Sequence, residues 1–387
     1  MKISVDKETF IKNWNIAEKN AATSGSMNIF STVRLTADSE KVELQSTDVR
    51  TSVICRASGV TVMEPGEAVI PIKGVSDLFK KAGSSEFMLQ VNDGQAVMVS
   101  GKSRYKFSTY PVGDFPKLPS SSGGSLFCSV KVSNLVSAIE KGMLCATSGD
   151  EFPQYLSSAY FDMNDGILNV VSTDKRRLAL CRTEITEGTE SASMMLPIKG
   201  IRELLRILSM IDQNIDIKII VDEAQAFFAA EGLEFAIRRI ETKFPDYAGK
   251  IPPSHITSAE VEKLHLLSAI ERVDVVVRDY NRTVMLKLEG DGECVLSGRA
   301  REFGEAVENI QCKMTGEPVL IGFNTRFFID AVKAIDDSTA CLFFNGREGH
   351  MMVKSKGSDN FICLVAPMDI PKEEIESIEA NADIDVL

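Results

Sequence analysis

The sequence of 387 residues is poor in the side chains that most often carry catalysis. It contains three histidines, and none of them lies in an HExxH pattern or beside a plausible nucleophile. GxSxG, Walker and protein-kinase motifs are also missing. We interpret the histidines as structural or surface residues, so the sequence gives little support to an enzyme.

Long apolar runs and paired cysteines are missing too. No run reaches the roughly 18–20 residues of a membrane span, and Met1 to Asp6 contain no signal-peptide core. The eight cysteines form no CxxC pair, which argues against zinc. Most have apolar neighbours, so we expect small buried hydrophobic residues in a reducing compartment. These absences predict a cytoplasmic protein without metal or other cofactor.

Positive charge is scarce overall, because 43 lysines and arginines face 55 acidic residues and the net charge is −12. Taken alone, this balance argues against nucleic-acid binding, which needs a basic surface. Aromatic stacking platforms and Gly-rich phosphate loops are absent as well, so nothing indicates readout of bases. Any contact with nucleic acid would have to follow the backbone without regard to sequence.

What the sequence does contain is an internal repeat. Ser46-Thr47-Asp48 returns as Ser172-Thr173-Asp174, and Pro71-Ile72-Lys73-Gly74 returns as Pro197-Ile198-Lys199-Gly200, both at an offset of 126 residues. A fainter third copy has Leu296 to Arg299 and Ile321 to Asn324. Repeats at a fixed offset indicate tandem structural units. We predict domains at 1–123, 124–253 and 254–370, followed by an acidic extension at 371–387.

Each repeat is expected to contain two helices and antiparallel strands, which makes the fold α+β. The first helix of each repeat is predicted from apolar residues at helical spacing: Phe10, Trp14 and Ala17; Val132, Leu135, Val136 and Ile139; Val261, Leu264, Leu267 and Ile270. The second helix follows the Pro-Ile-Lys-Gly motif or its counterpart. The six predicted helices cover 6–20, 73–81, 131–141, 199–208, 259–272 and 324–335.

These predicted helices carry a net charge of +5, which leaves −17 for the rest of the chain. If they share one surface, that surface attracts a polyanion. Surface lysines on helices are common, and without the repeat this plain explanation would be equally good. Because basic helices recur in the repeats, we favour the functional interpretation.

Two further features bear on function. Asp174, with Lys175 to Arg177, fits either phosphate chemistry or a turn in which the carboxylate accepts backbone amides, and its repeat at Asp48 favours the turn. The apolar run from Ile362 to Met368 is typical of a core strand, but its end passes a proline. An exposed apolar end beside a basic loop would form a peptide-docking groove.

Together these features resemble the bacterial DNA polymerase III beta subunit, the family of replicative sliding clamps. The resemblance covers residues 1–368 and is carried by the repeated motifs, Arg177-Leu178-Ala179, Phe244-Pro245-Asp246-Tyr247, Ile321 to Asn324 and Pro367-Met368. It implies a ring-shaped head-to-tail homodimer whose helices line a hole around double-stranded DNA. Such a ring is not an enzyme: it tethers the polymerase and confers processivity.

The resemblance also implies a groove between domains 2 and 3 for short peptides of the polymerase III alpha subunit, the clamp loader, other polymerases and repair proteins. Carried over by position, the groove comprises Leu156, Thr173, Lys175, Arg176, Arg177, Leu178, Pro245, Gly249, Lys250, Phe327, Leu364, Ala366, Pro367 and Met368. The chain departs from the family pattern at Lys175-Arg176, Gly249 and Ala366. A more positive groove with a smaller wall residue would prefer a more acidic or bulkier peptide.

Two further sets of positions follow from the resemblance. Candidates for contact with DNA are Lys12, Lys73, Lys80, Lys199, Arg202, Arg206, Arg278 and Arg282, and candidates for the dimer interface are Tyr105, Phe107, Val275 and Val276. The clamp would be cytoplasmic and nucleoid-associated. Residues 369–387 carry a net charge of −6 and are expected to cover the groove in part.

Two alternatives remain at this stage. The chain could be a repeat-built scaffold that binds peptides without encircling DNA, or an enzyme that acts on phosphorylated substrates near Asp174 and Arg177.

Overall fold

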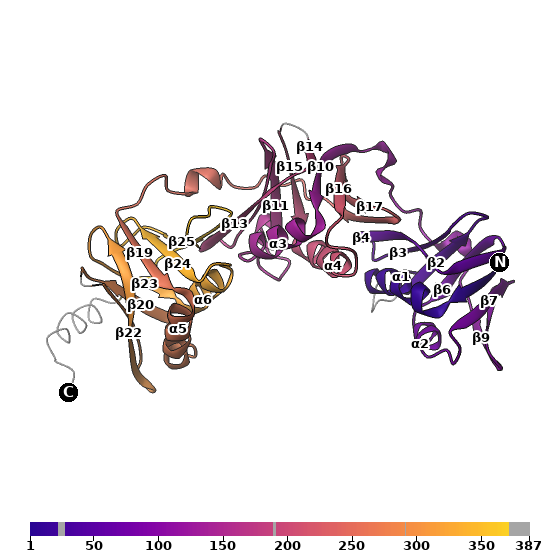
Figure 1. Cartoon of the computed structure of the whole chain (residues 1–387), viewed down its shortest axis with the longest axis horizontal. Helices are drawn as coiled ribbons and strands as arrows, with labels where there is room; N and C mark the ends of the chain where they lie inside the picture. The colour runs from indigo at the N-terminus through magenta and orange to yellow at the C-terminus, as the bar shows by residue number, and fades with distance from the viewer. Residues whose placement is uncertain (22–27, 189–190, 291, 371–387) are drawn as a thin grey trace. The chain divides into compact units, whose positions relative to one another are not determined.

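The computed structural model describes residues 1–21, 28–188, 191–290 and 292–370, so the predicted acidic extension lies outside the described residues. The chain forms two compact units. The first comprises 1–139, 161–168 and 183–242, and the second comprises 140–160, 169–182 and 243 onward. Each unit is built from antiparallel sheet with helices packed on it (Figure 1).

The first unit contains a five-stranded sheet, in the order β5-β1-β7-β8-β9, and a nine-stranded sheet, in the order β14-β10-β16-β17-β18-β4-β3-β2-β6. Its strands are β1 (Lys2–Asp6), β2 (Thr32–Ala37), β3 (Val42–Thr47), β4 (Thr51–Arg56), β5 (Val60–Glu64), β6 (Gly66–Pro71), β7 (Glu86–Asn92), β8 (Gln95–Ser100), β9 (Ser103–Ser108), β10 (Ser125–Lys131), β14 (Glu187–Gly188), β15 (Ser191–Pro197), β16 (Asp216–Val221), β17 (Gln225–Ala230) and β18 (Leu233–Arg238).

Three helices belong to the first unit: α1 (Lys7–Asn20), α2 (Val75–Lys80) and α4 (Ile198–Leu208). Trp14 of α1 is fully buried, with its ring centroid 4.8 Å from that of Phe79 on α2. Its indole Nε1 donates a 2.8 Å hydrogen bond to Ser76 Oγ, which satisfies the one polar group of the side chain. This cluster fastens α1 to α2.

The second unit contains strands β13-β26-β25-β24-β19-β22-β21-β20-β23 in that order. Helices α5 and α6 pack against each other (Figure 1). Helix α5 also packs on β21 and β22. Its elements are β19 (Thr257–Glu262), α5 (Lys263–Val277), β20 (Thr283–Leu288), β21 (Glu293–Ala300), β22 (Gly304–Thr315), β23 (Val319–Asn324), α6 (Thr325–Lys333), β24 (Thr339–Phe344), β25 (Met351–Ser355) and β26 (Phe361–Val365). Four elements contribute residues to both units: α3 (Val132–Gly142), β11 (Ser158–Asn164), β12 (Ile167–Thr173) and β13 (Arg177–Glu184).

The predicted α+β fold class is confirmed by the helices and antiparallel strands seen here. One helix prediction is wrong. Residues 257–262 form strand β19, and α5 starts at Lys263 and continues to Val277. Val261 is therefore a strand residue, and Leu264, predicted to be buried, is 65% exposed. The start of the helix was placed too early because apolar strand residues continue directly into the helix. Periodicity alone cannot locate that boundary.

The Pro-Ile-Lys-Gly motif has two conformations. In the first repeat it forms a turn, where Gly74 has φ +81° and caps the start of α2. In the second repeat it lies at the start of α4, and a Cβ on Gly200 would stand 2.7 Å from Ile237 Cγ2. Glycine is thus required by backbone conformation in one copy and by close packing in the other.

The Trp14–Ser76 hydrogen bond gives a test of the first unit. Trp14→Phe and Ser76→Ala should each lower the free energy of unfolding by about 1–2 kcal/mol, because each leaves a buried polar partner unmatched or a space unfilled. The double variant should lose about 1 kcal/mol less than the two single losses combined. Urea unfolding followed by far-ultraviolet circular dichroism measures this, and strictly additive losses would show that the hydrogen bond contributes nothing.

Candidate partner-binding site

The Ser-Thr-Asp motif at 172–174 forms the turn between β12 and β13. Thr173 Oγ1 donates to the carbonyl of Arg177 at 2.7 Å and accepts the amide of Lys175 at 3.1 Å. Asp174 Oδ1 accepts the amides of Arg176 and Arg177, both at 3.0 Å. The interpretation of Asp174 as a turn residue is confirmed, since its carboxylate is engaged with the backbone.

The same turn occurs in the first repeat. Thr47 Oγ1 bonds the carbonyl of Thr51 and the amide of Val49, and Asp48 Oδ1 accepts the amides of Arg50 and Thr51. Val49 and Lys175 occupy equivalent positions and both have positive φ, +77° and +74°. A β-branched residue rarely adopts this conformation, so the side-chain hydrogen bonds of the motif, and not the residue at its tip, impose the turn.

The strand after each turn pairs in the same way in both repeats. β4 pairs antiparallel with β18, and β13 pairs antiparallel with β26, so the last strand of the following repeat is added beside the turn. The two copies differ in the residue that starts this strand. Thr51 donates its hydroxyl to Asn20 Oδ1 at 2.9 Å, whereas Arg177 stands at the corresponding place in the second copy.

Arg177 is the centre of a largely buried ion-pair network. Its exposed fraction is 9%, its Nε donates to Asp174 Oδ2 at 2.9 Å, and its Nη1 donates to Asp330 Oδ2 on α6 at 2.8 Å. The guanidinium carbon lies 4.2 Å from the ring centroid of Phe327. A planar guanidinium suits this combination of two carboxylates and an aromatic face. The side chain therefore ties the turn to α6.

Beside this network lies a cavity of about 330 Å³, wholly within the second unit. Seven residues of the predicted groove line it: Thr173, Lys175, Arg177, Leu178, Pro245, Lys250 and Leu364. Five further lining residues were missed by the sequence analysis: Tyr155, Phe244, Asp246, Tyr247 and His350. Three of these five belong to the Phe244-Pro245-Asp246-Tyr247 motif, of which only Pro245 was predicted to belong to the groove.

The other predicted groove residues lie around the cavity and not in its wall. Phe327 contacts Arg177, and the amide of Ala366 donates to the carbonyl of Arg176 at 2.8 Å. The amide of Met368 donates to the carbonyl of Gly322 at 2.8 Å. The remaining members are Leu156, which is buried, and Gly249 and Pro367, which are at least partly exposed. The peptide-binding role of the whole set stays a prediction.

The aromatic wall is held by stacking. The rings of Tyr160 and Phe244 are parallel, with centroids 4.8 Å apart, and Tyr155 meets Phe244 edge-on at 6.1 Å. Apolar walls of this kind bind apolar side chains, and the polar groups at the rim fix their direction.

The rim of the cavity is basic. Lys175 and Lys250 are exposed, and the acidic lining residue Asp246 accepts the amide of Gly249 at 3.1 Å. The pKa of His350 is lowered, first by its partial burial and then by the positive charge of Lys250. The cavity thus joins an apolar wall to two ammonium groups.

The residues predicted to contact DNA lie on helices or near helix ends. Lys12, Lys73 and Arg202 are exposed, whereas Lys80 pairs with Glu18 and Arg206 with Glu203. Arg278 and Arg282 lie beyond the end of α5, near Asp279 and Asp274 respectively, and Lys199 lies in the first turn of α4. Tyr105 and Phe107 lie on β9, and Val275 and Val276 lie near the end of α5.

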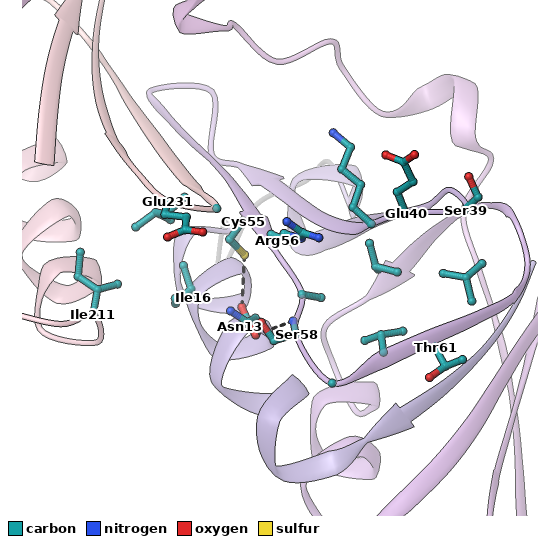
Figure 2. Close-up of a pocket in the computed structure, with 18 residues that line it drawn as sticks. Asn13, Ile16, Ser39, Glu40, Cys55, Arg56, Ser58, Thr61, Ile211 and Glu231 are labelled. Atoms are coloured by element: carbon teal, nitrogen blue, oxygen red, sulfur yellow. Dashed lines mark hydrogen bonds between the residues drawn. The ribbon is translucent and has the colours of Figure 1, made fainter. Parts of the chain in front are cut away.

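A larger hollow of about 710 Å³ lies in the first unit. In Figure 2, Asn13 of α1 faces the end of β4, where its carbonyl accepts Cys55 Sγ at 3.6 Å and its Oδ1 accepts the amide of Ser58 at 3.1 Å. The lining includes charged side chains of both signs, namely Glu40, Lys41, Arg56 and Glu231. This mixture selects no class of ligand, and we assign none.

The predicted burial of most cysteines is confirmed. Seven of the eight are buried, Cys312 is partly exposed, and all are free thiols. Burial raises the pKa of Cys55, Cys128 and Cys294 to about 12. Among the described residues no group of His, Cys, Asp and Glu side chains could hold a metal ion. No helix in the described ranges is long and apolar enough to cross a membrane.

Comparison with known proteins gives matches along most of the chain. Models of the DNA polymerase III beta subunit match with their N-terminal domain at 1–119, their central domain at 129–246 and their C-terminal domain at 250–369. The beta sliding clamp of Halalkalibacterium halodurans is 26% identical over 381 residues, which cover 95% of this chain and 99% of that protein.

Solved structures show the same fold. A DNA polymerase sliding clamp from Bacillus subtilis has a TM-score of 0.90 at 21% identity, and a sliding clamp from Pseudomonas aeruginosa bound to griselimycin has 0.90 at 23%. Each match covers 96% of this chain and 100% of the other. The resemblance seen in the sequence is confirmed. So is the interpretation as a non-enzymatic clamp, and the scaffold alternative is not favoured.

The Arg177 network makes a stability prediction with an internal control. Arg177→Leu should lower the free energy of unfolding by about 2–3 kcal/mol, because Asp174 and Asp330 lose their shared counter-charge in a largely buried place. Arg176→Leu, at an exposed neighbouring residue, should change it by less than about 0.5 kcal/mol. Urea unfolding compares the two, and equal effects would contradict the structural role of Arg177.

Proposed function

This chain belongs to the DNA polymerase III beta subunit family, and on that premise we propose that two copies join head to tail in a ring around duplex DNA. The helices face the hole and the sheets form the outside. The ring holds DNA by its topology and tethers the replicative polymerase to its template. Tethering raises the local concentration of the polymerase and so confers processivity.

The observation that carries this proposal is a pair of sheet edges with opposite charge. β9 is the last strand of its sheet, and one of its edges has no strand partner among the described residues. It carries Arg104 and Lys106, and Lys102 precedes it. A free edge of this kind pairs readily with another strand, and its positive charge favours an acidic one.

The acidic counterpart lies in the second unit. β21 pairs with Gly304–Gln311 of β22, and no described strand pairs with the other edge of this stretch. It carries Glu305 and Glu308, and Arg301 and Glu302 precede it, so acidic residues outnumber basic ones along this edge. Because the two edges belong to opposite parts of the chain, pairing between them is head to tail, and such contacts give a ring when the rotation closes.

Exposed apolar side chains accompany the acidic edge. Phe303 is 68% exposed, Val307 56% and Val275 48%. Arg272 holds α5 against β22 through Glu308, at 2.6 Å, and Val275 follows one turn later on the same helix face. Tyr105 and Phe107 on β9 are the corresponding half-buried residues. The two aromatic residues of β9 and the valines and Phe303 of the acidic side fit one apolar contact between copies.

DNA binding is assigned to the basic helix residues already named, without sequence preference. On α4, Lys199, Arg202 and Arg206 face a single acidic residue, Glu203. Ion pairs with Glu18, Glu203, Asp279 and Asp274 partly neutralise four of the candidates, Lys80, Arg206, Arg278 and Arg282 respectively. Weak binding to DNA suits a sliding ring, because the ring stays on the duplex by encircling it and not by high affinity.

The cavity beside Arg177 is assigned to short peptides of the polymerase III alpha subunit, the clamp loader, other polymerases and repair proteins. Its apolar wall and basic rim support this role. We further propose the domain division 1–123, 124–253 and 254–370, and association with the nucleoid.

Oligomeric state is the first test. Light scattering over a dilution series should give twice the chain mass of 42.4 kDa. Val275→Asp should give monomers, because a carboxylate without a partner in an apolar contact is costly. Val49→Asp, at an exposed valine of the first unit, should leave the dimer intact. A wild-type chain that is monomeric at every concentration would contradict the ring.

Encirclement is the second test. The clamp, loaded onto nicked circular DNA by a bacterial clamp loader, should stay with the DNA during gel filtration and leave it after a single restriction cut. The cut turns the circle into a linear molecule but leaves the charge and the base sequence of the DNA unchanged. Release after the cut therefore reports topology alone. Equal retention on circular and linear DNA would indicate ordinary binding instead of a closed ring.

A further inference from the structure

The basic rim of the cavity is the feature that the proposed function leaves unexplained. Lys175 and Lys250 line the same cavity, and within the described part of the chain neither ammonium forms an ion pair. Arg177, by contrast, is neutralised by Asp174 and Asp330. Asp246 is the acidic residue of the lining, so the two lysines still leave positive charge in excess. This excess beside an apolar wall favours an occupant that combines carboxylates with apolar side chains.

The position of Lys175 is also fixed. Its amide donates to Thr173 Oγ1, and its backbone is held at φ +74° by the turn. Lys250 is the last residue of a short 3-10 turn, Ala248–Lys250, and its amide donates to the carbonyl of Tyr247 at 3.1 Å. Both side chains are therefore presented by an ordered backbone, which lowers the entropy lost when a ligand pairs with them.

The chain itself contains a segment with the required chemistry. Residues 371–387 hold six acidic residues against one lysine, and three isoleucines, Ile375, Ile378 and Ile384, are spaced among them. The matching family model ends at residue 369, so this segment belongs to the present chain and not to the family pattern. Its negative charge and apolar side chains are complementary to the cavity.

The path of the preceding residues brings this segment close to the cavity. Leu364 lines the cavity, Ala366 is bonded to Arg176, and Met368 is bonded to Gly322. Ile370 lies six positions after Leu364, which limits the distance between their Cα atoms to about 20 Å. Seventeen further residues span up to about 60 Å when extended. A tethered segment of this length reaches the cavity at an effective concentration of the order of millimolar.

We propose that residues 371–387 bind the lysine-rimmed cavity of their own chain and compete there with partner peptides. Their carboxylates pair with Lys175 and Lys250, and an isoleucine enters the apolar wall formed by Leu178, Pro245 and Leu364. The proposal rests on the assigned role of the cavity as the partner site. A partner must then displace the segment, which sets a threshold on the affinity of productive partners.

The test uses a fluorescein-labelled synthetic peptide with the sequence of residues 371–387 and measures its binding by fluorescence anisotropy. A chain ending at Ile370 should bind the peptide, and the intact chain should bind it at least tenfold more weakly, because its own segment fills the cavity. Lys175→Glu with Lys250→Glu in the shortened chain should weaken binding at least tenfold. Lys218→Glu, at an exposed lysine of β16, is the matched control and should have no effect.

Salt and an independent ligand complete the design. Raising sodium chloride from 50 to 500 mM should weaken peptide binding, because the contact is largely ionic. Griselimycin, the compound bound to the Pseudomonas aeruginosa clamp, is titrated in parallel into the shortened chain and into its Leu178→Ala variant. Circular dichroism establishes that the variants are folded.

The outcomes separate the two proposals. If griselimycin binds and depends on Leu178, but the labelled peptide does not bind or binds the intact and shortened chains equally, the cavity remains a ligand site and the segment proposal is overturned. If peptide binding is lost with Lys199→Glu and Arg202→Glu instead of the rim lysines, the segment binds the DNA-facing helices and the proposal is likewise overturned. If neither ligand binds, the assigned role of the cavity fails as well.

Discussion

The structure around the site depends on one carboxylate accepting two backbone amides. In the turn at 172–177, Asp174 holds the chain in a shape that a lysine with positive φ would not adopt by itself. That shape starts β13 in the position where β26 can pair with it, and it turns Asp174 Oδ2 toward Arg177. The sheet, the ion-pair network and the cavity wall all follow from it. The same turn at 46–51 supports the pairing of β4 with β18.

The contrast between the two turns shows how a repeated structural device acquires a local function. In the first copy, Thr51 is bonded to Asn20 of α1, and the contact is short and neutral. In the second copy, Arg177 reaches Asp330 on α6 and lies against Phe327, so one long side chain links the turn to the next helix pair. The two turns share their backbone geometry, and the difference lies in the length and charge of the side chain at position 51 or 177.

Much of this could be predicted from the sequence, because repeated motifs at a constant offset report structure directly. The two turns, the order of elements and the burial of Phe10, Trp14 and Ala17 follow from local pattern. The boundary between β19 and α5 could not be placed, since Val261 satisfies a strand and a helix equally well. Tyr155 and His350 were missed because their contribution comes from chain packing across about 200 residues, for which one sequence has no signal. Phe244 and Tyr247 were visible as a motif, but their stacking on Tyr160 was not.

The edges of β9 and β22 that have no strand partner within the described residues also have a consequence for the behaviour of the protein in solution. An unpaired strand edge is a template for indiscriminate association, and charged side chains reduce that hazard only in part. A chain with two such edges of opposite charge can join its neighbours into open filaments as well as closed pairs. A contact that covers both edges at once therefore also keeps the protein soluble. We expect fibrous aggregation when that contact is weakened, as in interface variants or during purification at low ionic strength.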